Sequence, residues 1–282
     1  MTGVQTCALP IYPKTSLLPS ANFSYNFSEK MLIRAAYGQT VNRPEFRELA
    51  PFSFYDFDFN VVFEGYTQLK TALVNNFDAR WEYYPTPSEI VSVAAFYKNF
   101  TNPIEVEVEP GSGSLGAKTF IFQNAGSAKS AGLELEVRKG LASLTKSPLL
   151  EKVSVLFNAA LIYSRIKLRE GAVGQSDNRP MQGQSPYIIN ASLQYTEPKT
   201  NIGLSVLFNK AGARIWLLDQ YYSRIIFEQP RPVLDFKISK GLFDNKGSVE
   251  FSWADILHKN AIFFNDVDGN GKYNKGTDLV AI

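Results

Sequence analysis

The chain has 282 residues, of which 45% are hydrophobic, 13% aromatic and 20% charged, and its formal net charge is +2. This composition excludes an intrinsically disordered chain, and the near balance of charge provides no basic surface for nucleic acid. One cysteine and one histidine exclude a disulfide framework and a zinc site built from cysteines or paired histidines. No run of about 18 uncharged apolar residues is present, so the sequence predicts no transmembrane helix.

The first eleven residues, MTGVQTCALPI, differ in character from the rest of the chain. They have no basic segment ahead of an apolar one, and Pro10 interrupts the short apolar stretch, so they do not form a secretory signal peptide. They resemble a translated sequencing adapter. We therefore expect two parts, an adapter artefact at 1–11, which includes the only cysteine, Cys7, and the protein itself at 12–282.

From residue 17 onward, apolar and polar residues alternate with a period of two, which is typical of strands with one apolar face. In LVNNFDARWEYY, Phe77, Ala79, Trp81 and Tyr83 alternate with polar and charged residues. The ten predicted strands lie, in chain order, at 21–27, 33–37, 73–84, 91–100, 133–138, 153–165, 189–195, 204–209, 234–238 and 248–256. Most approach the roughly 9–11 residues that a tilted strand needs to cross a bilayer.

The connections between the predicted strands alternate in length. Short ones at 28–30, 86–89, 197–200 and 243–247, and a slightly longer one at 142–152, alternate with long ones at 43–70, 103–128, 167–184 and 214–229. Short periplasmic turns and long extracellular loops are the signature of an outer-membrane barrel. Strands of a soluble β-sandwich average only about 5–6 residues. The pattern therefore favours an all-β fold, a partial transmembrane antiparallel up-and-down barrel with its apolar face toward lipid.

The ten predicted strands do not make a closed barrel. By alternation, the first strand runs toward the periplasm and the tenth runs outward, so a returning strand is expected beyond the end of the chain. Two unpaired strand edges in lipid would cost on the order of tens of kcal/mol, more than the roughly 5–15 kcal/mol of net stability of a folded protein. We therefore expect the chain to be a fragment.

Five segments, in this order along the chain, resemble TonB-dependent outer-membrane receptors of the Bacteroidetes type. They are YGQTVNRPEFRELAPFSFYDF (37–57), LVNNFDARWEYYPTPSEIVSVAAFYKNFTNPIE (73–105), AGLELEVRKGL (131–141), RPMQGQSPYIINASLQYT (179–196) and FEQPRPVLDFKISKGL (227–242). The resemblance implies a Gram-negative outer-membrane barrel of about 22 strands, filled by an N-terminal plug domain and coupled through the plug to TonB. On that template the ten strands are the twelfth to the twenty-first, and the plug and the closing strand are absent from this sequence.

The same resemblance implies a function in energy-coupled uptake of a scarce nutrient of the siderophore, haem, cobalamin or oligosaccharide class. Its implied partners are outer-membrane lipid, the plug domain, TonB through the plug, and a surface lipoprotein. A passive diffusion porin is the first alternative, with about 16–18 strands and no plug. A soluble β-rich adhesin or carbohydrate-binding module is the second.

Aromatic and charged side chains are interleaved in the long connection at 43–70. Rigid rings give a binding surface its contact area, and charges orient the ligand. We therefore predict an extracellular ligand-binding loop. Its residues are Arg43, Glu45, Arg47, Phe52, Phe54, Tyr55 and Asp56. Alternatively, the loop folds into the barrel and packs against the plug, with Glu45 and Glu48 paired with Arg43 and Arg47.

The last predicted loop contains NDVDGNGKYNKGTD, which resembles the start of a calcium-binding loop. Asp266, Asp268 and Asn270 place oxygens at every second residue, where they can converge on one cation. The twelfth position is Thr277 rather than a bidentate glutamate, and Asp278 follows one residue later. The sequence predicts either a weak calcium site at Asp266, Asp268, Asn270 and Asp278 or a turn-rich polar loop. No other cofactor is predicted.

Three glutamates, Glu105, Glu107 and Glu109, alternate with apolar residues ahead of a glycine-rich segment. We interpret them as the solvated face of an extracellular hairpin. No G-x-S-x-G motif, P-loop or His–carboxylate pairing on neighbouring strands is present, and His258 stands alone near the end of the last strand. The sequence therefore predicts a protein that is not an enzyme.

Overall fold

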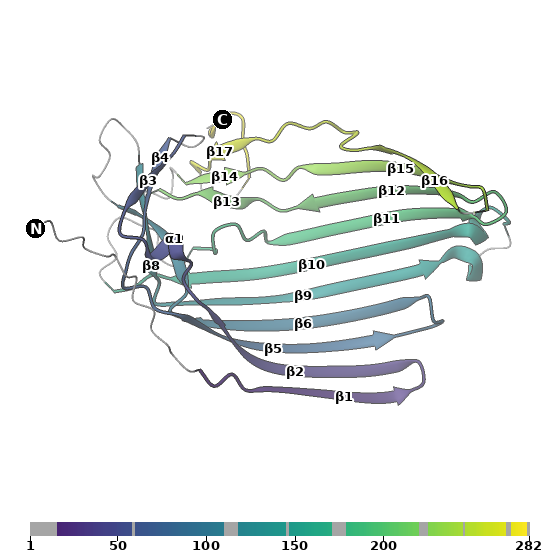
Figure 1. Ribbon diagram of the computed structural model, residues 1–282, viewed down its shortest axis with the longest axis horizontal. Coiled ribbons are helices and arrows are strands. Elements are labelled where there is room, and N and C mark those ends of the chain that lie inside the picture. The colour runs from purple at the N-terminus through teal and green to yellow at the C-terminus, as the bar shows by residue number, and fades with distance from the viewer. Residues whose placement is uncertain are drawn as a thin grey trace, which may run out of the picture.

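The computed structural model describes residues 16–57, 60–109, 118–144, 147–170, 179–219, 225–244, 246–268 and 272–280. One large sheet makes up most of this part of the chain, and two small sheets lie together at one end of it (Figure 1). Residues 1–11 lie outside the described residues, as does the predicted calcium ligand Asn270. No helix in the described ranges is long and apolar enough to cross a membrane.

The large sheet contains ten antiparallel strands in the order β1-β2-β5-β6-β9-β10-β11-β12-β15-β16. Each of the ten predicted strands is present, which confirms the interpretation of the period-two pattern. Their bounds are β1 Ser20–Ser28, β2 Met31–Asn42, β5 Ala72–Tyr83, β6 Ile90–Thr101, β9 Ser127–Gly140, β10 Val153–Lys167, β11 Tyr187–Glu197, β12 Ile202–Ala211, β15 Pro232–Leu242 and β16 Gly247–Trp253. Strand β16 ends at Trp253, three residues before the predicted end, and Asp255 beyond it has a left-handed backbone.

Short connections lie at one end of the large sheet and long ones at the other, as the sequence predicted (Figure 1). The connection between β9 and β10 contains two 3₁₀ turns, Leu141–Ser143 and Leu150–Lys152. The tight turn between β11 and β12 places Asn201 at a φ of 52°, a left-handed conformation that asparagine tolerates better than most residues.

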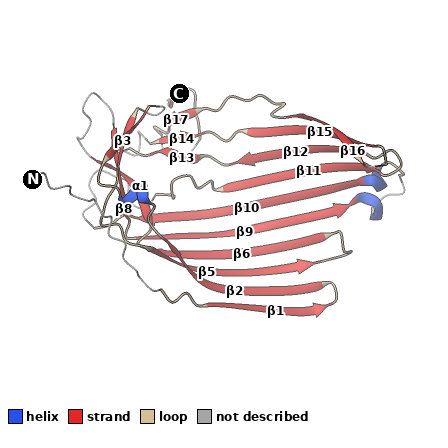
Figure 2. Cartoon of the chain, in the orientation of Figure 1, coloured by secondary structure: helices blue, strands red, loops and turns tan. Residues whose placement is uncertain are grey.

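The long connections contain eight short strands, and Figure 2 shows them clustered at the end opposite the short turns. The sequence predicted only the hairpin that carries Glu105 and Glu107, which is present as β7 and β8. One small sheet has the order β3-β4-β8-β7 and the other β13-β14-β17-β18. Their bounds are β3 Ser53–Asp56, β4 Val61–Glu64, β7 Ile104–Glu109, β8 Lys118–Asn124, β13 Arg214–Leu217, β14 Ile226–Glu228, β17 Phe263–Asn265 and β18 Leu279–Val280. We call these two sheets, with the four-residue helix α1 (Phe46–Leu49), the loop cap.

One face of the large sheet is polar, and ion pairs join side chains of neighbouring strands on it. The Arg80 guanidinium contacts Glu82 at 2.9 Å and Glu136 at 2.6 Å, and Arg34 contacts Glu82 at 3.4 Å. A hollow of about 200 Å³ lies among these side chains, and its wall includes Arg80, Ser92, Glu134, Glu136, Asn158 and Asn190. A face with ion pairs around a hollow suits a water-filled lumen.

The opposite face is apolar and uncovered. The register places Trp81 beside Ile33 and Val93, and Val93 beside Leu135, so the predicted lipid-facing residues of neighbouring strands lie in line. Leu135 is 38% exposed in the middle of its strand, and Leu133 is 56% exposed. The same face carries the rest of the predicted set, Phe77, Ala79, Tyr83, Val137, Leu234, Phe236 and Ile238.

The apolar band on this face is about as tall as the apolar band of known outer-membrane barrels. On β9, Lys129 and Lys139 lie on this face, with only Ala131, Leu133, Leu135 and Val137 between them on the same side. Ten residue steps span roughly 34 Å along a strand, and a tilt of about 40° reduces this to roughly 26 Å. The apolar band of outer-membrane barrels is about 25 Å tall, so the two lysines mark its edges.

Candidate functional site

The two sheets of the loop cap share one hydrophobic core. Its buried residues come from β4, β7 and β8 on one side and from β13, β14, β17 and the segments beside them on the other. They are Val61, Val108, Phe120, Ile215, Leu218, Ile225, Phe227 and Phe264. Segments more than 150 residues apart thus pack as one unit. Burial of large apolar side chains stabilises by about 1.5–3 kcal/mol each, so the long loops hold one another in a defined shape.

Ion pairs also join the loops. Arg179 donates from Nη2 to Oε2 of Glu105 on β7 at 3.0 Å, and both side chains are buried, 1% and 8% exposed. Arg169 contacts Glu107 on the same strand at 3.6 Å. Lys118 on β8 donates to the buried Asp219 at 2.5 Å. The interpretation of Glu105 and Glu107 as a solvated face is therefore wrong, because the segments that follow β10 cover them.

Burial shifts the pKa values of these carboxyls. It raises the pKa of Glu105 above its ordinary value, although the Arg179 guanidinium pulls that pKa down. Burial likewise raises the pKa of Glu107, against the opposing effect of Arg169. Oε1 of Glu107 and Nε of Arg179 have no hydrogen-bond partner in the described part of the chain. The side chain of Glu109 lies outside that part.

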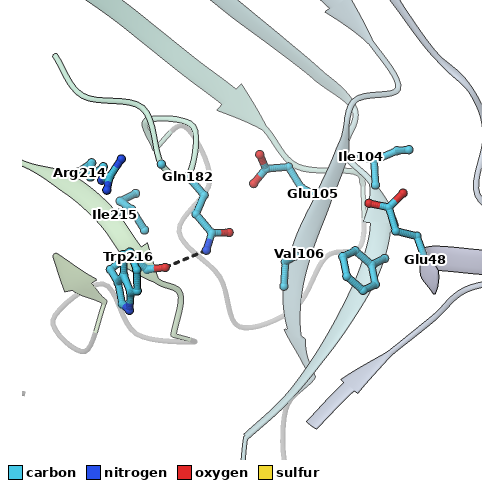
Figure 3. A pocket seen from close by; sticks show the side chains of 10 residues that line it. Glu48, Ile104, Glu105, Val106, Gln182, Arg214, Ile215 and Trp216 are labelled. Atoms are coloured by element: carbon cyan, nitrogen blue, oxygen red, sulfur yellow. Dashed lines mark hydrogen bonds between the residues drawn. The ribbon is translucent and has the colours of Figure 1, made fainter. Parts of the chain in front are cut away.

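A cavity of about 370 Å³ lies between the two sheets of the loop cap. Figure 3 shows Glu105 and Gln182 between Glu48 and Ile104 on one side and Arg214, Ile215 and Trp216 on the other. Gln182 donates from its amide to the carbonyl of Trp216 at 3.0 Å, which fixes one wall. Carboxylates, a guanidinium, an amide and aromatic rings meet here, so the cavity can accept a ligand with both polar and apolar parts.

The predicted ligand-binding loop lies beside this cavity rather than around it. Of that loop, Glu48 lines the cavity, whereas the seven predicted ligand residues are absent from the lining that the structure describes. The Arg47 guanidinium stacks on Phe54 at 3.8 Å, and Phe54 stacks on Phe63 at 5.4 Å. Tyr55 donates to Asn60 at 2.5 Å, whereas Phe52 stays 61% exposed.

The acidic and basic residues around helix α1 do not pair as the alternative interpretation supposed. The carboxylate of Glu48 accepts a hydrogen bond from the backbone N–H of Glu45 at 2.9 Å, and the Glu45 side chain completes a capping box. Arg43 and Glu45 are exposed, and Asp56 is half-buried at the end of β3. The loop thus has a fixed local structure with an exposed aromatic edge.

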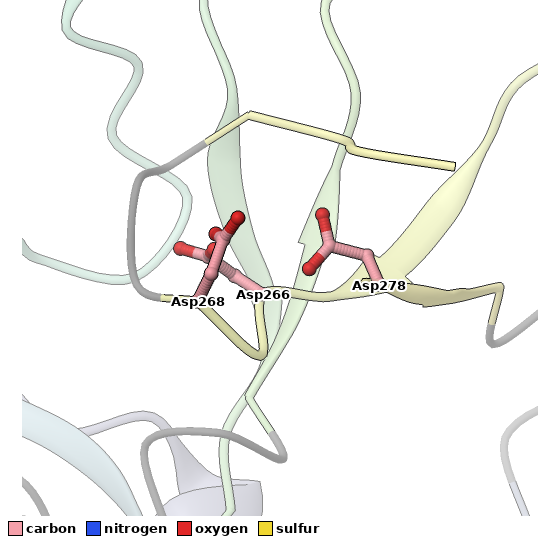
Figure 4. Close-up of side chains that lie close together, drawn as sticks. All are labelled: Asp266, Asp268 and Asp278. Carbon is pink, nitrogen blue, oxygen red and sulfur yellow. The ribbon is translucent and has the colours of Figure 1, made fainter. Parts of the chain in front are cut away.

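Three of the four predicted calcium residues are brought together. Oxygens of Asp266, Asp268 and Asp278 all lie within 4.8 Å of one another, as Figure 4 shows. Asp266 is fully buried and Asp278 is 6% exposed. Asp278 accepts backbone hydrogen bonds from Val267 at 3.0 Å and from Asn274 at 2.7 Å. Asp278, one position late in the motif, thus lies beside Asp266 and Asp268.

Two residues of the candidate site were missed by sequence reasoning. Arg179 and Gln182 lie in the long connection at 167–184 and carry no local motif, so their partners on β7 and β13 could not be read from neighbouring residues. The only signal in the sequence was the alternation of Glu105 and Glu107 with apolar residues, which indicated two faces on that strand but not what covers them.

A family model described as "Outer membrane protein beta-barrel family" matches residues 12–279. Comparison with curated protein sequences finds no match. Among solved structures, the siderophore receptor PirA from Pseudomonas aeruginosa is similar with a TM-score of 0.61 at 15% identity, covering 86% of this chain and 39% of that one. The ferric enterobactin receptor PfeA from the same organism gives 0.60 at 17% identity, with 86% and 35% covered. The ferric-catecholate import receptor Fiu from Escherichia coli K12 gives 0.59 at 14%, with 86% and 31% covered.

The chain thus spans between 31% and 39% of the length of these three structures. Identities this low show the fold alone, which is that of an outer-membrane β-barrel. The ten long strands, the apolar band and the family match agree with one another, and they overturn the alternative of a soluble β-rich module. Because the family model covers nearly the whole chain, the protein belongs to the outer membrane β-barrel family and lies in the outer membrane of a Gram-negative bacterium.

Proposed function

We propose that this chain forms part of the wall and the extracellular cap of a TonB-dependent receptor, which takes up a scarce nutrient by energy-coupled transport. The observation that carries the proposal is the loop cap, a folded unit with its own core at one end of ten membrane-spanning strands. The similarity in fold to siderophore receptors supports it and makes ferric siderophores the first substrate class to test. Haem, cobalamin and oligosaccharides are the other classes.

The large sheet has two exposed edges, β1 and β16, whose residues are exposed along almost their whole length. In this proposal further strands of a longer barrel pair with both edges, and a plug domain fills the lumen and contacts TonB. A surface lipoprotein that covers the loop cap is a further proposed partner. A passive porin is the alternative function, but a porin needs no folded unit with a ligand-sized cavity at its mouth.

Uptake should depend on TonB. In a strain that expresses the complete receptor under iron limitation, we expect accumulation of radiolabelled ferric siderophore, and deletion of TonB should reduce it to background. The physical reason is that a plugged barrel has no open passage, so work must be done on the plug before a bound ligand moves. Uptake that stays unchanged without TonB, and that rises linearly with substrate concentration, would support the porin instead.

We also propose that Asp266, Asp268 and Asp278 bind Ca²⁺ weakly, with Asn270 as a further ligand. Three carboxylates within 4.8 Å of one another repel, and a hard divalent cation that takes oxygen ligands relieves this repulsion. Extracellular calcium sites of this kind have dissociation constants of about 10⁻⁴–10⁻³ M.

The effect of Asp266→Asn on hydrogen-exchange protection should depend on calcium. Without the cation, the substitution removes repulsion, so we expect the 263–280 region to be as protected from hydrogen exchange as in the parent protein, or better. With several millimolar CaCl₂, the parent should gain protection in this region and the variant should gain little. MgCl₂ serves as the control, since Mg²⁺ gives up its water reluctantly. Identical exchange of the parent with and without CaCl₂ would count against the site.

A further inference from the structure

The lipid-facing side of β9 and β10 ends in basic residues next to the loop cap. Lys129 lies on this side of β9, and Arg165 and Lys167 lie on this side of β10, directly beyond the aromatic ring of Tyr163. The register places Arg165 opposite Lys129, and the other neighbour of Lys129 is the uncharged Asn99. Like charges directly opposite each other destabilise a sheet, so this arrangement needs a compensating partner.

The protein itself supplies no such partner among the residues that the structure describes. No carboxylate there lies within ion-pair distance of Lys129, Arg165 or Lys167. The Arg165 guanidinium lies 5.0 Å from the centroid of the Tyr163 ring, and it donates only a long bond of 3.4 Å to the Ser164 carbonyl. On the lumen side, Arg34 and Arg80 both contact Glu82, and on the lipid-facing side Lys139 contacts Glu89. Lys129 and Arg165 differ from these residues because two cations lie directly opposite each other with no carboxylate in contact in the described part of the chain.

A cavity of about 400 Å³ adjoins Arg165. Its lining includes Tyr163, Arg165, Tyr187, Arg214 and Lys272, together with proline and phenylalanine side chains. Ile162 and Ser164, on the lumen side of β10, complete this part of the lining, whereas Tyr163, Arg165 and Tyr187 lie on the lipid-facing side of their strands. The part of the wall that these three residues form therefore faces the bilayer. Arg214 contacts Glu228 at 2.7 Å. Basic groups beside aromatic and apolar walls suit an amphiphile with an anionic head.

The position of the basic residues identifies the membrane leaflet. Lys129 marks the edge of the apolar band on the side of the long loops, and in an outer-membrane barrel that side is extracellular. The lipid at this height is the phosphorylated glycolipid of the outer leaflet. A phosphate group between Lys129 and Arg165 would accept charge-assisted hydrogen bonds from both, and would turn the repulsion between them into attraction.

We propose that Lys129, Arg165 and Lys167 bind the phosphate groups of the outer-leaflet glycolipid, and that part of this lipid occupies the cavity beside Arg165. The inference rests on the outer-membrane location and not on the transported ligand. It holds for a receptor and for a porin alike. The bound lipid anchors the barrel wall at the strands that lead into the loop cap.

The test compares purified protein, extracted from outer membranes, with its K129Q/R165Q variant. The probes are bis-phosphorylated lipid A and the same lipid after removal of both phosphates, titrated in detergent and followed by native mass spectrometry. Loss of two charge-assisted hydrogen bonds should weaken binding of the phosphorylated lipid about tenfold or more. Binding of the dephosphorylated lipid should be weak for both proteins and unaffected by the substitutions.

The matched control is Lys98→Gln. Lys98 lies opposite Ser130, the neighbour of Lys129, but faces the lumen, where its ammonium lies 5.8 Å from the Phe96 ring centroid. Lipid binding should be unchanged in this variant. Equal weakening by K98Q, or parent-level binding by K129Q/R165Q, would overturn the proposal. So would displacement of the lipid by inorganic phosphate at equal concentration, because the site would then recognise free phosphate.

A second variant distinguishes a loss of lipid binding from a loss of folding. In Lys129→Glu the new carboxylate faces Arg165 and replaces repulsion by an ion pair, so the variant should melt at the same or a higher temperature in phosphate-free detergent. Added lipid A should raise the melting temperature of the parent protein and leave that of K129E nearly unchanged. A similar lipid-induced rise in both proteins contradicts a phosphate site at Lys129.

Discussion

Replacement of Arg179 by glutamine should destabilise the loop cap by about 3–5 kcal/mol, the usual cost of removing one partner of a buried ion pair. The Arg179 side chain is 1% exposed, and Glu105 is its partner at 3.0 Å. Without the guanidinium, the Glu105 carboxylate stays buried on β7 with no opposite charge in contact. The cost arises from this uncompensated charge rather than from the lost contact alone.

The pH dependence of the variant follows from the same charge. Burial already raises the pKa of Glu105, and removal of Arg179 raises this pKa further. A carboxyl whose pKa is higher in the folded than in the unfolded state favours folding at low pH, and this contribution is lost as the pH rises through the folded-state pKa. The penalty of Arg179→Gln should therefore be largest at neutral pH and shrink in acid.

Native-state hydrogen exchange of the β7 and β8 amides measures this penalty in the intact protein. The control is Arg214→Gln, which breaks a half-exposed pair with Glu228 and should cost at most about 1 kcal/mol. A double variant with methionine at Arg179 and leucine at Glu105 should recover most of the lost protection, because an apolar pair leaves no buried charge. Equal protection in R179Q and the parent protein would show that the ion pair does not hold the cap.

The large sheet was predictable because its determinants are local. In a membrane strand, each residue faces either lipid or the lumen, so the alternation of Phe77, Ala79 and Trp81 with Asp78 and Arg80 already specifies both faces. The turns are short and the neighbours antiparallel, so sequence order equals spatial order for these ten strands. The predicted strands, turns and lipid-facing residues are accordingly confirmed.

The loop cap was not predictable because its determinants are distant. Strand β4 pairs in parallel with β8, Val61 opposite Lys118, although more than fifty residues separate them. Strands of two to seven residues carry too little pattern to be distinguished from irregular loops. The burial of Glu105 depends on Arg179, which lies 74 residues further on. Only the spaced aspartates of the last loop, which are close together in the sequence, left a readable signal.

The second large effect concerns Leu135, where substitution by arginine should destabilise the barrel in lipid by about 2–4 kcal/mol. Leu135 lies in the middle of β9, six residues from the band edge at Lys129 and four from the edge at Lys139, and its neighbours in register are Val93 and Ala159. An arginine there places its charge near the middle of the bilayer. The guanidinium cannot reach either interface without bending the side chain or thinning the membrane.

The matched control is Glu134→Arg, one residue away on the same strand. Glu134 lines the polar hollow of about 200 Å³, beside Ala94 and Ala160 in register. Water and salt screen a charge change in the lumen, so this variant should cost much less than Leu135→Arg. Reversible unfolding of both variants of the complete receptor in lipid vesicles compares the two costs directly. Neighbouring residues differ in this way only if residues alternate between a lipid-facing and a lumen-facing side of the strand. Equal costs at both positions would therefore refute this assignment of the two faces. The lipid-binding proposal and the transport proposal both depend on that assignment.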